Sequence, residues 1–102
     1  MFFRKDEEYV EMDHQEEKKE GKIPIHVEKI KEYADSDRIQ KKLRDGSILL
    51  IDIKHLRETN INELKRAIDR VRRTCEAMGG EIAGVGEDWI IATPPSAKIN
   101  RD

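Results

Sequence analysis

The fold of this chain is decided by residues 60–95, whose sequence is NINELKRAIDRVRRTCEAMGGEIAGVGEDWIIATPP. Apolar side chains recur in its first half at steps of three and four, which is the spacing of one helix face. Asn60 with Glu63 three residues later is a helix-start signal, and Gly79 and Gly80 can supply the left-handed stop. The segment therefore predicts a long amphipathic helix that leads into a hairpin. The apolar stripe consists of Ile61, Leu64, Ile68, Val71, Cys75 and Met78.

Four strands and a second helix are expected around this segment. Residues 80–85 and 88–93 form the hairpin, with its turn at residues 86–88. Residues 47–53 (SILLIDI) form a strand of continuous apolar character, and apolar residues alternate with polar ones from Ile23 to Val27. Ser36 is expected to cap a short helix that ends at Gly46, and residues 54–59 are interpreted as a connection.

The order of these elements, β-α-β-α-β-β, predicts a compact α/β sandwich of two layers. Parallel crossovers are right-handed, so a four-stranded mixed sheet should carry both helices on one face. Pro24 confines the first strand to an edge, because proline cannot donate to a ladder. The strongly apolar strands 47–53 and 88–93 belong in the middle.

Both faces of the central strands are apolar, which two helices cannot cover. In strand 47–53, Ile48 and Leu50 point to one face, whereas Leu49 and Ile51 point to the other. An exposed apolar patch of a few hundred Å² (an order-of-magnitude figure) on a single domain usually marks an interface. We therefore expect a homodimer whose contact uses the uncovered face of the sheet.

Composition favours a small cytosolic domain. The chain has 102 residues, of which 41% are charged, and it lacks an apolar run near the about 20 residues that span a bilayer. Its lone cysteine, Cys75, fits a reducing compartment and is expected to pack as a small hydrophobe. Two Gln and three Asn among so many charges is a composition typical of thermophile proteins.

The charges are distributed unevenly. Residues 1–20 hold four basic and eight acidic side chains, so that 4 − 8 = −4. Residues 6–22 contain almost no core-forming side chains and are expected to be an acidic disordered linker. The expected organisation is a tip at residues 1–5, this linker, a globular domain at 23–97 and a tail at 98–102.

Candidate catalytic and metal-binding residues are few. His14, His26 and His55 lack metal-ligand spacing, and Asp52 at a strand end has no partner carboxylate. The sequence contains no recognisable set of nucleophile, base and acid. We therefore expect that the protein is not an enzyme and that it binds no metal and no cofactor.

The glycines favour turns over a phosphate cradle, which needs glycines between a strand and a helix. Gly46, Gly79, Gly80 and Gly86 are interpreted as structural turns and caps. Gly84 lies inside a strand, where it suggests either a bulge or the close approach of another backbone.

The long helix carries a cluster of basic residues with two interpretations. The cluster could bind nucleic acid or an acidic peptide, or it could be a solvated face balanced by neighbouring carboxylates. No aromatic side chains interleave with it for base stacking, which favours the solvated face. Its members are Lys65, Arg66, Arg70, Arg72 and Arg73.

Two segments resemble the SepF family of cell-division proteins. One is AMGGEIAGVGEDWIIATP (residues 77–94), and the other is RDGSILLIDI (residues 44–53), within a resemblance that covers residues 23–94. The resemblance implies a dimeric α/β adaptor that binds the C-terminal peptide of FtsZ and tethers it to the inner membrane face. It also implies that Gly84 and Ile90, with Val85 and Trp89 beside them, form the peptide site.

The family resemblance further implies a lipid-binding N-terminus, here reduced to a short tip. Burial of its two phenylalanines stabilises by only a few kcal/mol, an order-of-magnitude value, and a dimer would double the anchors. Arg73 occupies a position where bacterial members often carry glycine, so an archaeal-type dimer is expected. The tip consists of Met1, Phe2, Phe3, Arg4 and Lys5.

The alternative hypothesis is a small RNA- or DNA-binding domain. The β-α-β-α-β-β order also occurs in Alba-type chromatin proteins and in the C-terminal domain of a translation initiation factor. Such a domain would use the arginines of the long helix. The acidic N-terminal segment and the net charge of −2 argue against nucleic acid as a partner.

Overall fold

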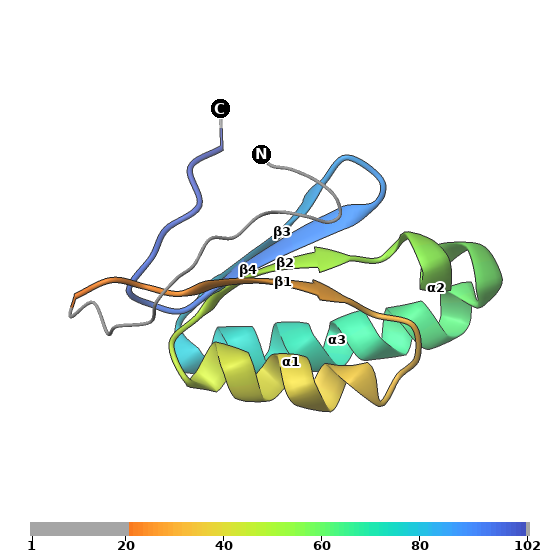
Figure 1. The fold of residues 1–102 in the computed structure, drawn as a ribbon, viewed down its shortest axis with the longest axis horizontal. Helices are drawn as coiled ribbons and strands as arrows, with labels where there is room; N and C mark the ends of the chain where they lie inside the picture. Colours follow the sequence, from red (N-terminus) through yellow and green to blue (C-terminus); the bar gives the residue numbers. More distant parts are fainter. Residues whose placement is uncertain (1–20, 102) are drawn as a thin grey trace, which may run out of the picture.

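The computed structural model describes residues 21–101, so the expectations for the tip and for nearly all of the linker fall outside the described residues. Helices and strands follow one another as the sequence predicts, with one added helix (Figure 1). The elements are β1 (Ile25–Lys29), α1 (Asp35–Arg44), β2 (Ile48–Asp52), α2 (Lys54–Thr59), α3 (Ile61–Met78), β3 (Glu81–Val85) and β4 (Trp89–Thr93).

The four strands form one mixed sheet in the order β1-β2-β4-β3. β1 pairs with β2 in parallel, and the other two pairings are antiparallel. This arrangement confirms the predicted sheet, with β1 at one edge and the apolar strands β2 and β4 in the middle. β3 forms the other edge.

The core lies between one face of the sheet and the two longer helices, which run side by side beneath it (Figure 1). Leu49 and Ile51 of β2 and Ala92 of β4 point into this layer and are buried. Cys75 of α3 is also fully buried, and its Sγ donates to the carbonyl oxygen of Glu81 at 3.0 Å. Cys75 therefore packs in the core as a small hydrophobe, and its burial raises the pKa of the thiol.

Helix α3 begins and ends as its sequence predicts. The side-chain oxygen of Asn60 accepts a hydrogen bond from the Glu63 amide at 3.1 Å, which satisfies one of the free donors of the first turn. Gly79 ends the helix with φ of 82°, a left-handed conformation that glycine adopts without steric cost.

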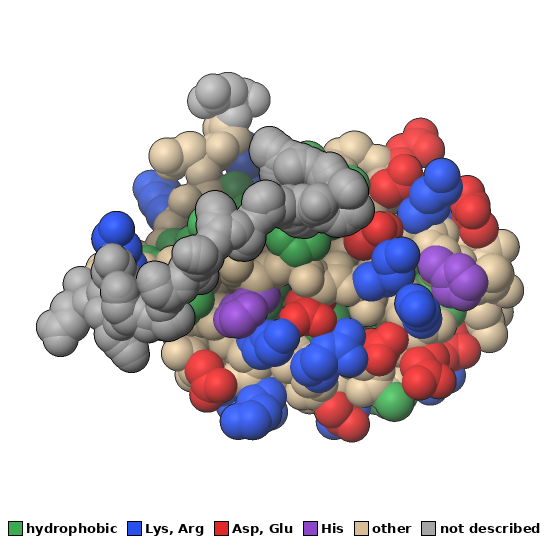
Figure 2. Space-filling model, viewed as in Figure 1, with side chains coloured by type: hydrophobic (Ala, Val, Ile, Leu, Met, Phe, Trp, Pro, Cys, Tyr) green, Lys and Arg blue, Asp and Glu red, His purple; other side chains and the backbone are tan. Residues whose placement is uncertain are grey.

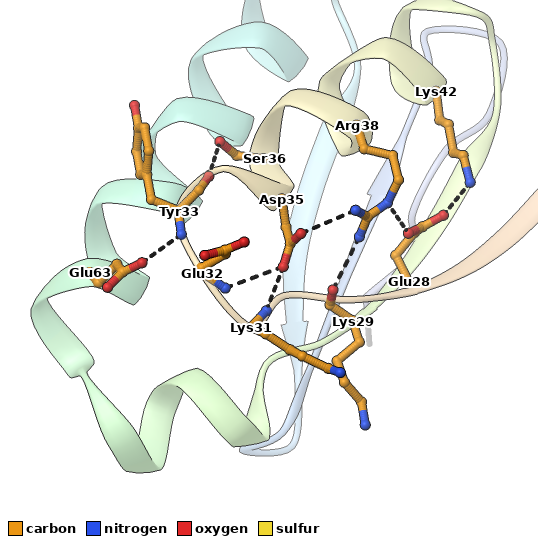
Figure 3. Close-up of polar contacts among 10 residues, drawn as sticks. All are labelled: Glu28, Lys29, Lys31, Glu32, Tyr33, Asp35, Ser36, Arg38, Lys42 and Glu63. Atoms are coloured by element: carbon orange, nitrogen blue, oxygen red, sulfur yellow. Dashed lines mark hydrogen bonds and ion pairs between the residues drawn. The ribbon is translucent and has the colours of Figure 1, made fainter.

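The prediction that Ser36 caps α1 is wrong. The N-cap is Ala34, whose side chain makes no capping hydrogen bond. The Asp35 carboxylate instead accepts hydrogen bonds from the amides of Lys31 (2.8 Å) and Glu32 (3.2 Å), which lie in the loop before the helix (Figure 3). Ser36 is fully buried within the first turn, where its hydroxyl donates to the carbonyl of Tyr33 at 2.7 Å.

The connection at residues 54–59 is also a correction, because these residues form the short helix α2. The Asp52 carboxylate accepts a hydrogen bond from the Lys54 amide at 3.0 Å, and Leu56 anchors the turn in the core. Arg57 pairs with Asp88 at 2.5 Å. Helix α2 is therefore tied to the tip of the β3–β4 hairpin.

A network of charged side chains joins α1 to β1 (Figure 3). The Glu28 carboxylate accepts hydrogen bonds from Arg38 Nε at 2.8 Å and from Lys42, and Arg38 also reaches Asp35 at 3.1 Å. Burial alone would raise the pKa of Glu28, but the hydrogen bonds from Lys42 and Arg38 outweigh it and leave that pKa below its ordinary value.

Candidate functional site

A groove runs between α3 and the edge strand β3. Its volume is 260 Å³, and its floor is apolar because isoleucines from the helix and from both hairpin strands meet there. Gly84 and Ile90 are cross-strand partners in it. The lining residues are Ile68, Arg72, Ile82, Ala83, Gly84 and Ile90.

Gly84 opens this groove. A Cβ on Gly84 would meet no atom within 4 Å, so the missing side chain leaves a hollow over the floor. The β3–β4 register continues unbroken through Gly84, which excludes a bulge, one of the two interpretations given for this glycine. On the side where a Cβ would project, no atom of the described chain lies within 4 Å, and the position is open to a segment from outside.

A second hollow of 460 Å³ continues the groove along α3 and gives it a basic wall. The two hollows share Ile68 and Arg72, so they form one surface. The added residues are Lys65, Arg66 and Asp69, and the wall thus holds three basic side chains and one acidic. We call this combined surface the α3–β3 groove.

Val85 and Trp89, by contrast, lie on the opposite face of the sheet. They pair with each other across the hairpin, and they are 53% and 37% exposed. Because side chains alternate along a strand, Val85 cannot share a face with Gly84. The structure therefore divides the four predicted peptide-site residues: Gly84 and Ile90 line the groove, whereas Val85 and Trp89 do not.

The sheet face that carries Val85 and Trp89 is apolar across all four strands. Ile25 and Val27 of β1 are 62% and 66% exposed there, and the register places them opposite Ile48 and Leu50 of β2. Neither α1 nor α3 covers this face. We call it the open face.

Most basic residues of α3 already have partners. Arg66 and Arg70 lie over the Tyr33 ring, with guanidinium carbons 4.9 and 5.4 Å from its centroid, and Arg70 pairs with Asp37 at 2.5 Å. Arg72 and Arg73 both pair with Asp69. Figure 2 shows the same mixture over α1 and the β1 edge, where basic and acidic side chains are interspersed. The face of the molecule seen in Figure 2 therefore has no continuous basic surface that would suit nucleic acid.

The remaining candidates for chemistry stay apart. At the end of β2, the Asp52 carboxylate accepts a hydrogen bond from the Lys54 amide, which is a local structural contact. Among residues 21–101, no three His, Cys, Asp or Glu side chains gather closely enough to hold a metal ion.

Comparison with known families decides the identity of the fold. A family model described as cell division protein SepF matches residues 25–99. The chain belongs to the SepF family. The match spans the whole sheet and all three helices, and it confirms the resemblance carried by residues 44–53 and 77–94.

Individual SepF proteins support the assignment. The cell division protein SepF of Haloferax volcanii is 27% identical over 101 residues, which cover 96% of this chain and 85% of the relative. A SepF-like protein from Archaeoglobus fulgidus superposes with a TM-score of 0.73 at 29% identity, covering 78% of this chain and 95% of that one. A SepF-like protein from Pyrococcus furiosus gives 0.72 at 27% identity, covering 80% and 99%.

The SepF fold also recurs in a solved complex. SepF from Methanobrevibacter smithii, in complex with the FtsZ C-terminal domain, has a TM-score of 0.68 at 17% identity, with coverage of 78% of this chain and 99% of that one. At this identity the likeness concerns the fold. Within residues 21–101 of the present chain, no helix has both the length and the apolar character needed to cross a bilayer.

Sequence reasoning did not place Ile68, Arg72 or Ile82 of this SepF-family chain in the peptide site, although all three line the groove. Ile68 was placed on the apolar stripe of the helix, but it lies at the margin of that stripe and is only partly buried. Arg72 follows it by four residues and so lies on the same helix face. Ile82 shares a face with Gly84 by strand alternation. The spacing of these residues along the helix and the strand would therefore have indicated the groove, if the helix and the edge strand had been known to be neighbours.

Proposed function

We propose that this SepF-family chain is a non-enzymatic division adaptor that binds the C-terminal peptide of FtsZ in the α3–β3 groove. It acts as a homodimer through the open face and contacts the cytoplasmic membrane surface through residues 1–5. In this proposal the protein is peripheral on the inner membrane face at the division site.

The observation that carries peptide binding is the hollow over Gly84. An extended peptide needs apolar depth for one or two side chains and polar groups that fix its direction. The groove supplies a floor of Ile68, Ile82 and Ile90 with Arg72 at its rim. That a SepF protein of the same fold is in complex with the FtsZ C-terminal domain supports an FtsZ peptide as the occupant here.

Dimerisation is supported by the open face. Exposed Ile25, Val27, Val85 and Trp89 lie on one side of one sheet, and a soluble protein rarely leaves such an apolar surface in water. A second copy is the partner that suits a sheet face, because a two-fold axis pairs the patch with itself. The contact would leave the α3–β3 groove free, because the groove lies on the helix side of the sheet.

Membrane contact is supported by sequence alone. Phe2 and Phe3 beside Arg4 and Lys5 combine apolar insertion with attraction to anionic lipid. A dimer presents two such tips, so avidity would strengthen a weak single anchor. The test is co-sedimentation with anionic liposomes of the full chain and of a chain that lacks residues 1–5. Equal amounts of the two chains in the pellet would contradict membrane contact through the tip.

Titration of a fluorescent peptide that copies the FtsZ C-terminus tests the adaptor function. We expect saturable binding that changes little between low and moderate salt, because the floor is apolar. Absence of binding at hundreds of micromolar peptide, an order-of-magnitude ceiling for a functional site, contradicts the proposal. Nucleic acid serves as the competing ligand, and steeply salt-dependent binding of a DNA or RNA oligomer would favour the alternative function.

The groove variant for this titration is Gly84→Val. The side chain of Ile90 is only 8% exposed, so a charge at position 90 would disturb the core as well as the groove. A valine at position 84 instead projects into open space and fills the hollow without a clash. We expect the affinity for the peptide to fall by about tenfold or more, because the valine would occupy the space in which about two methyl groups of the peptide are buried.

A further inference from the structure

The outer edge of β3 presents backbone groups that no strand of the sheet pairs, and these lie beside the groove. The Ile53 amide donates to the Asp88 carbonyl at 2.8 Å, so the backbone groups of Asp88, and of Ile90 two residues on, point from β4 toward β2. Gly84 is the cross-strand partner of Ile90 on β3. Its amide and carbonyl, and those of Ile82 two residues before, therefore point outward from the sheet.

The C-terminal residues of the chain cover part of this edge. We call residues 95–101 the C-terminal strap. The Glu81 carboxylate accepts a hydrogen bond from the Ile99 amide at 2.9 Å, and the Arg101 guanidinium donates to the Ile82 carbonyl at 3.3 Å. The second contact confirms that the Ile82 carbonyl points outward. The strap thus occupies the acceptor that an added strand would use.

The strap contact and the groove meet at one residue. Ile82 supplies its side chain to the groove floor and its carbonyl to Arg101. An extended peptide that lies in the groove along β3 would pair with the outward groups of Ile82 and Gly84, the mode by which peptides add to sheet edges. Arg101 and such a peptide cannot both hold the Ile82 carbonyl in the same geometry.

We propose that the C-terminal strap is a displaceable occupant of the β3 edge that regulates peptide entry into the α3–β3 groove. This inference rests on the proposed function and adds a binding mode and a regulating element to it. The incoming peptide joins the four-stranded sheet beside β3 and displaces Arg101 from Ile82. Edge strands in soluble proteins are commonly blocked against unwanted pairing, and here the block at the Ile82 carbonyl rests on one hydrogen bond from the exposed Arg101 side chain.

Removal of the strap contact should strengthen peptide binding. In Arg101→Ala the Ile82 carbonyl is free before the peptide arrives, so the peptide need not compete with the guanidinium. We expect Kd for the FtsZ C-terminal peptide to fall by about three- to tenfold, the range of one net hydrogen bond. Lys98→Ala is the matched control, because it removes the same charge from an exposed position on the same strap. Its Kd should stay within about twofold of the parent value.

The outcomes separate the strap from the adaptor function. Equal or weaker binding by Arg101→Ala, with the parent chain still binding, overturns the strap and leaves the adaptor function standing. An absence of binding by every variant overturns both. Hydrogen exchange gives an independent reading: the bound peptide should slow exchange of the Gly84 amide, which points outward in the free chain. Binding that leaves that amide unprotected would overturn the added strand.

Discussion

The carbonyl oxygen of Thr93 lies where a side chain on Gly80 would begin, since a Cβ on Gly80 would be 2.0 Å from it. The same Cβ would be 3.1 Å from the Sγ of Cys75. The end of α3 therefore meets the end of β4 with backbone against backbone. The two consecutive glycines have different roles: Gly79 supplies the left-handed turn, and Gly80 supplies the space.

This contact predicts that one substitution, glycine to alanine, has a large effect on stability at Gly80 and a small one at Gly84. Gly80→Ala should destabilise the fold by about 2 kcal/mol or more, because a buried backbone must shift to admit the methyl group. Gly84→Ala should change stability by less than about 0.5 kcal/mol, since its Cβ enters open space. Urea denaturation of both variants measures the difference. Equal stabilities would contradict the packing described at Gly80.

The network around Glu28 predicts a specific dependence of stability on pH. The folded pKa of Glu28 lies below its ordinary value of 4.5, so its stabilisation is present above that pH and is lost as pH falls through the lower folded pKa. Glu28→Gln should lower the free energy of unfolding by about 1 kcal/mol at pH 7 and flatten the acid limb.

The control for this experiment is Asp45→Asn, which removes an exposed carboxylate that follows α1 and pairs with Lys41 at 3.8 Å. That pair is solvated, so the substitution should cost less than about 0.5 kcal/mol at any pH. Thermal melts from pH 7 to pH 3 of the three proteins provide the measurement. Parallel pH profiles for the parent and Glu28→Gln would show that Glu28 is not the responsible group.

The open face predicts that one charge separates the dimer. Val27→Asp places a carboxylate within the proposed contact, while the side chain is solvated in the monomer. Light scattering should report a monomer for this variant at concentrations where the parent is dimeric. Trp89, the single tryptophan, lies on the same face, so its emission should shift to longer wavelength on dissociation.

Ile61→Asp is the matched control for the dimer, because Ile61 is also an exposed apolar residue but lies in the first turn of α3. An acidic residue is tolerated there, near the positive end of the helix dipole. Its dimer should persist. Dissociation of both variants, or of neither, would contradict a dimer held by the open face.

The sheet order could be predicted from sequence because few residues decide it. Pro24 excludes the first strand from the middle, and the apolar character of both faces of β2 and β4 requires neighbours on each side. Helix α2 could not be predicted from residues 54–59, since six residues carry no helical period. Its stability comes from Leu56 in the core and from Arg57 on Asp88, which are contacts distant in sequence.

The cap of α1 shows how tertiary burial overrides a local signal. Ser36 has the right residue type for an N-cap, but it is fully buried, and its hydroxyl donates a hydrogen bond to the Tyr33 carbonyl. Arg70 of α3 also donates to that hydroxyl at 3.2 Å. The carboxylate of the neighbouring Asp35 accepts hydrogen bonds from the amides of Lys31 and Glu32, so it orders the loop that leads into the helix.

The sequence predicts a peptide site of Gly84, Val85, Trp89 and Ile90. Because side chains alternate along β3 and β4, Gly84 and Ile90 lie on one face of the sheet, and Val85 and Trp89 lie on the other. Adjacent residues such as Gly84 and Val85 must point to opposite faces, which the sequence alone could have indicated. The contribution of α3 was harder to foresee. It depends on the helix lying beside the edge strand, so that Ile68 and Arg72 complete a groove with residues far along the chain.

The most direct test of the central claim is an NMR titration of the ¹⁵N-labelled chain with the FtsZ C-terminal peptide. If the peptide lies in the α3–β3 groove, the largest shift changes should occur at Ile68, Arg72, Ile82 and Gly84, and Gly84→Val should suppress them. Val27 and Trp89 on the open face should change little. Shifts concentrated on Val27 and Trp89, with the groove unaffected, would contradict the proposed site.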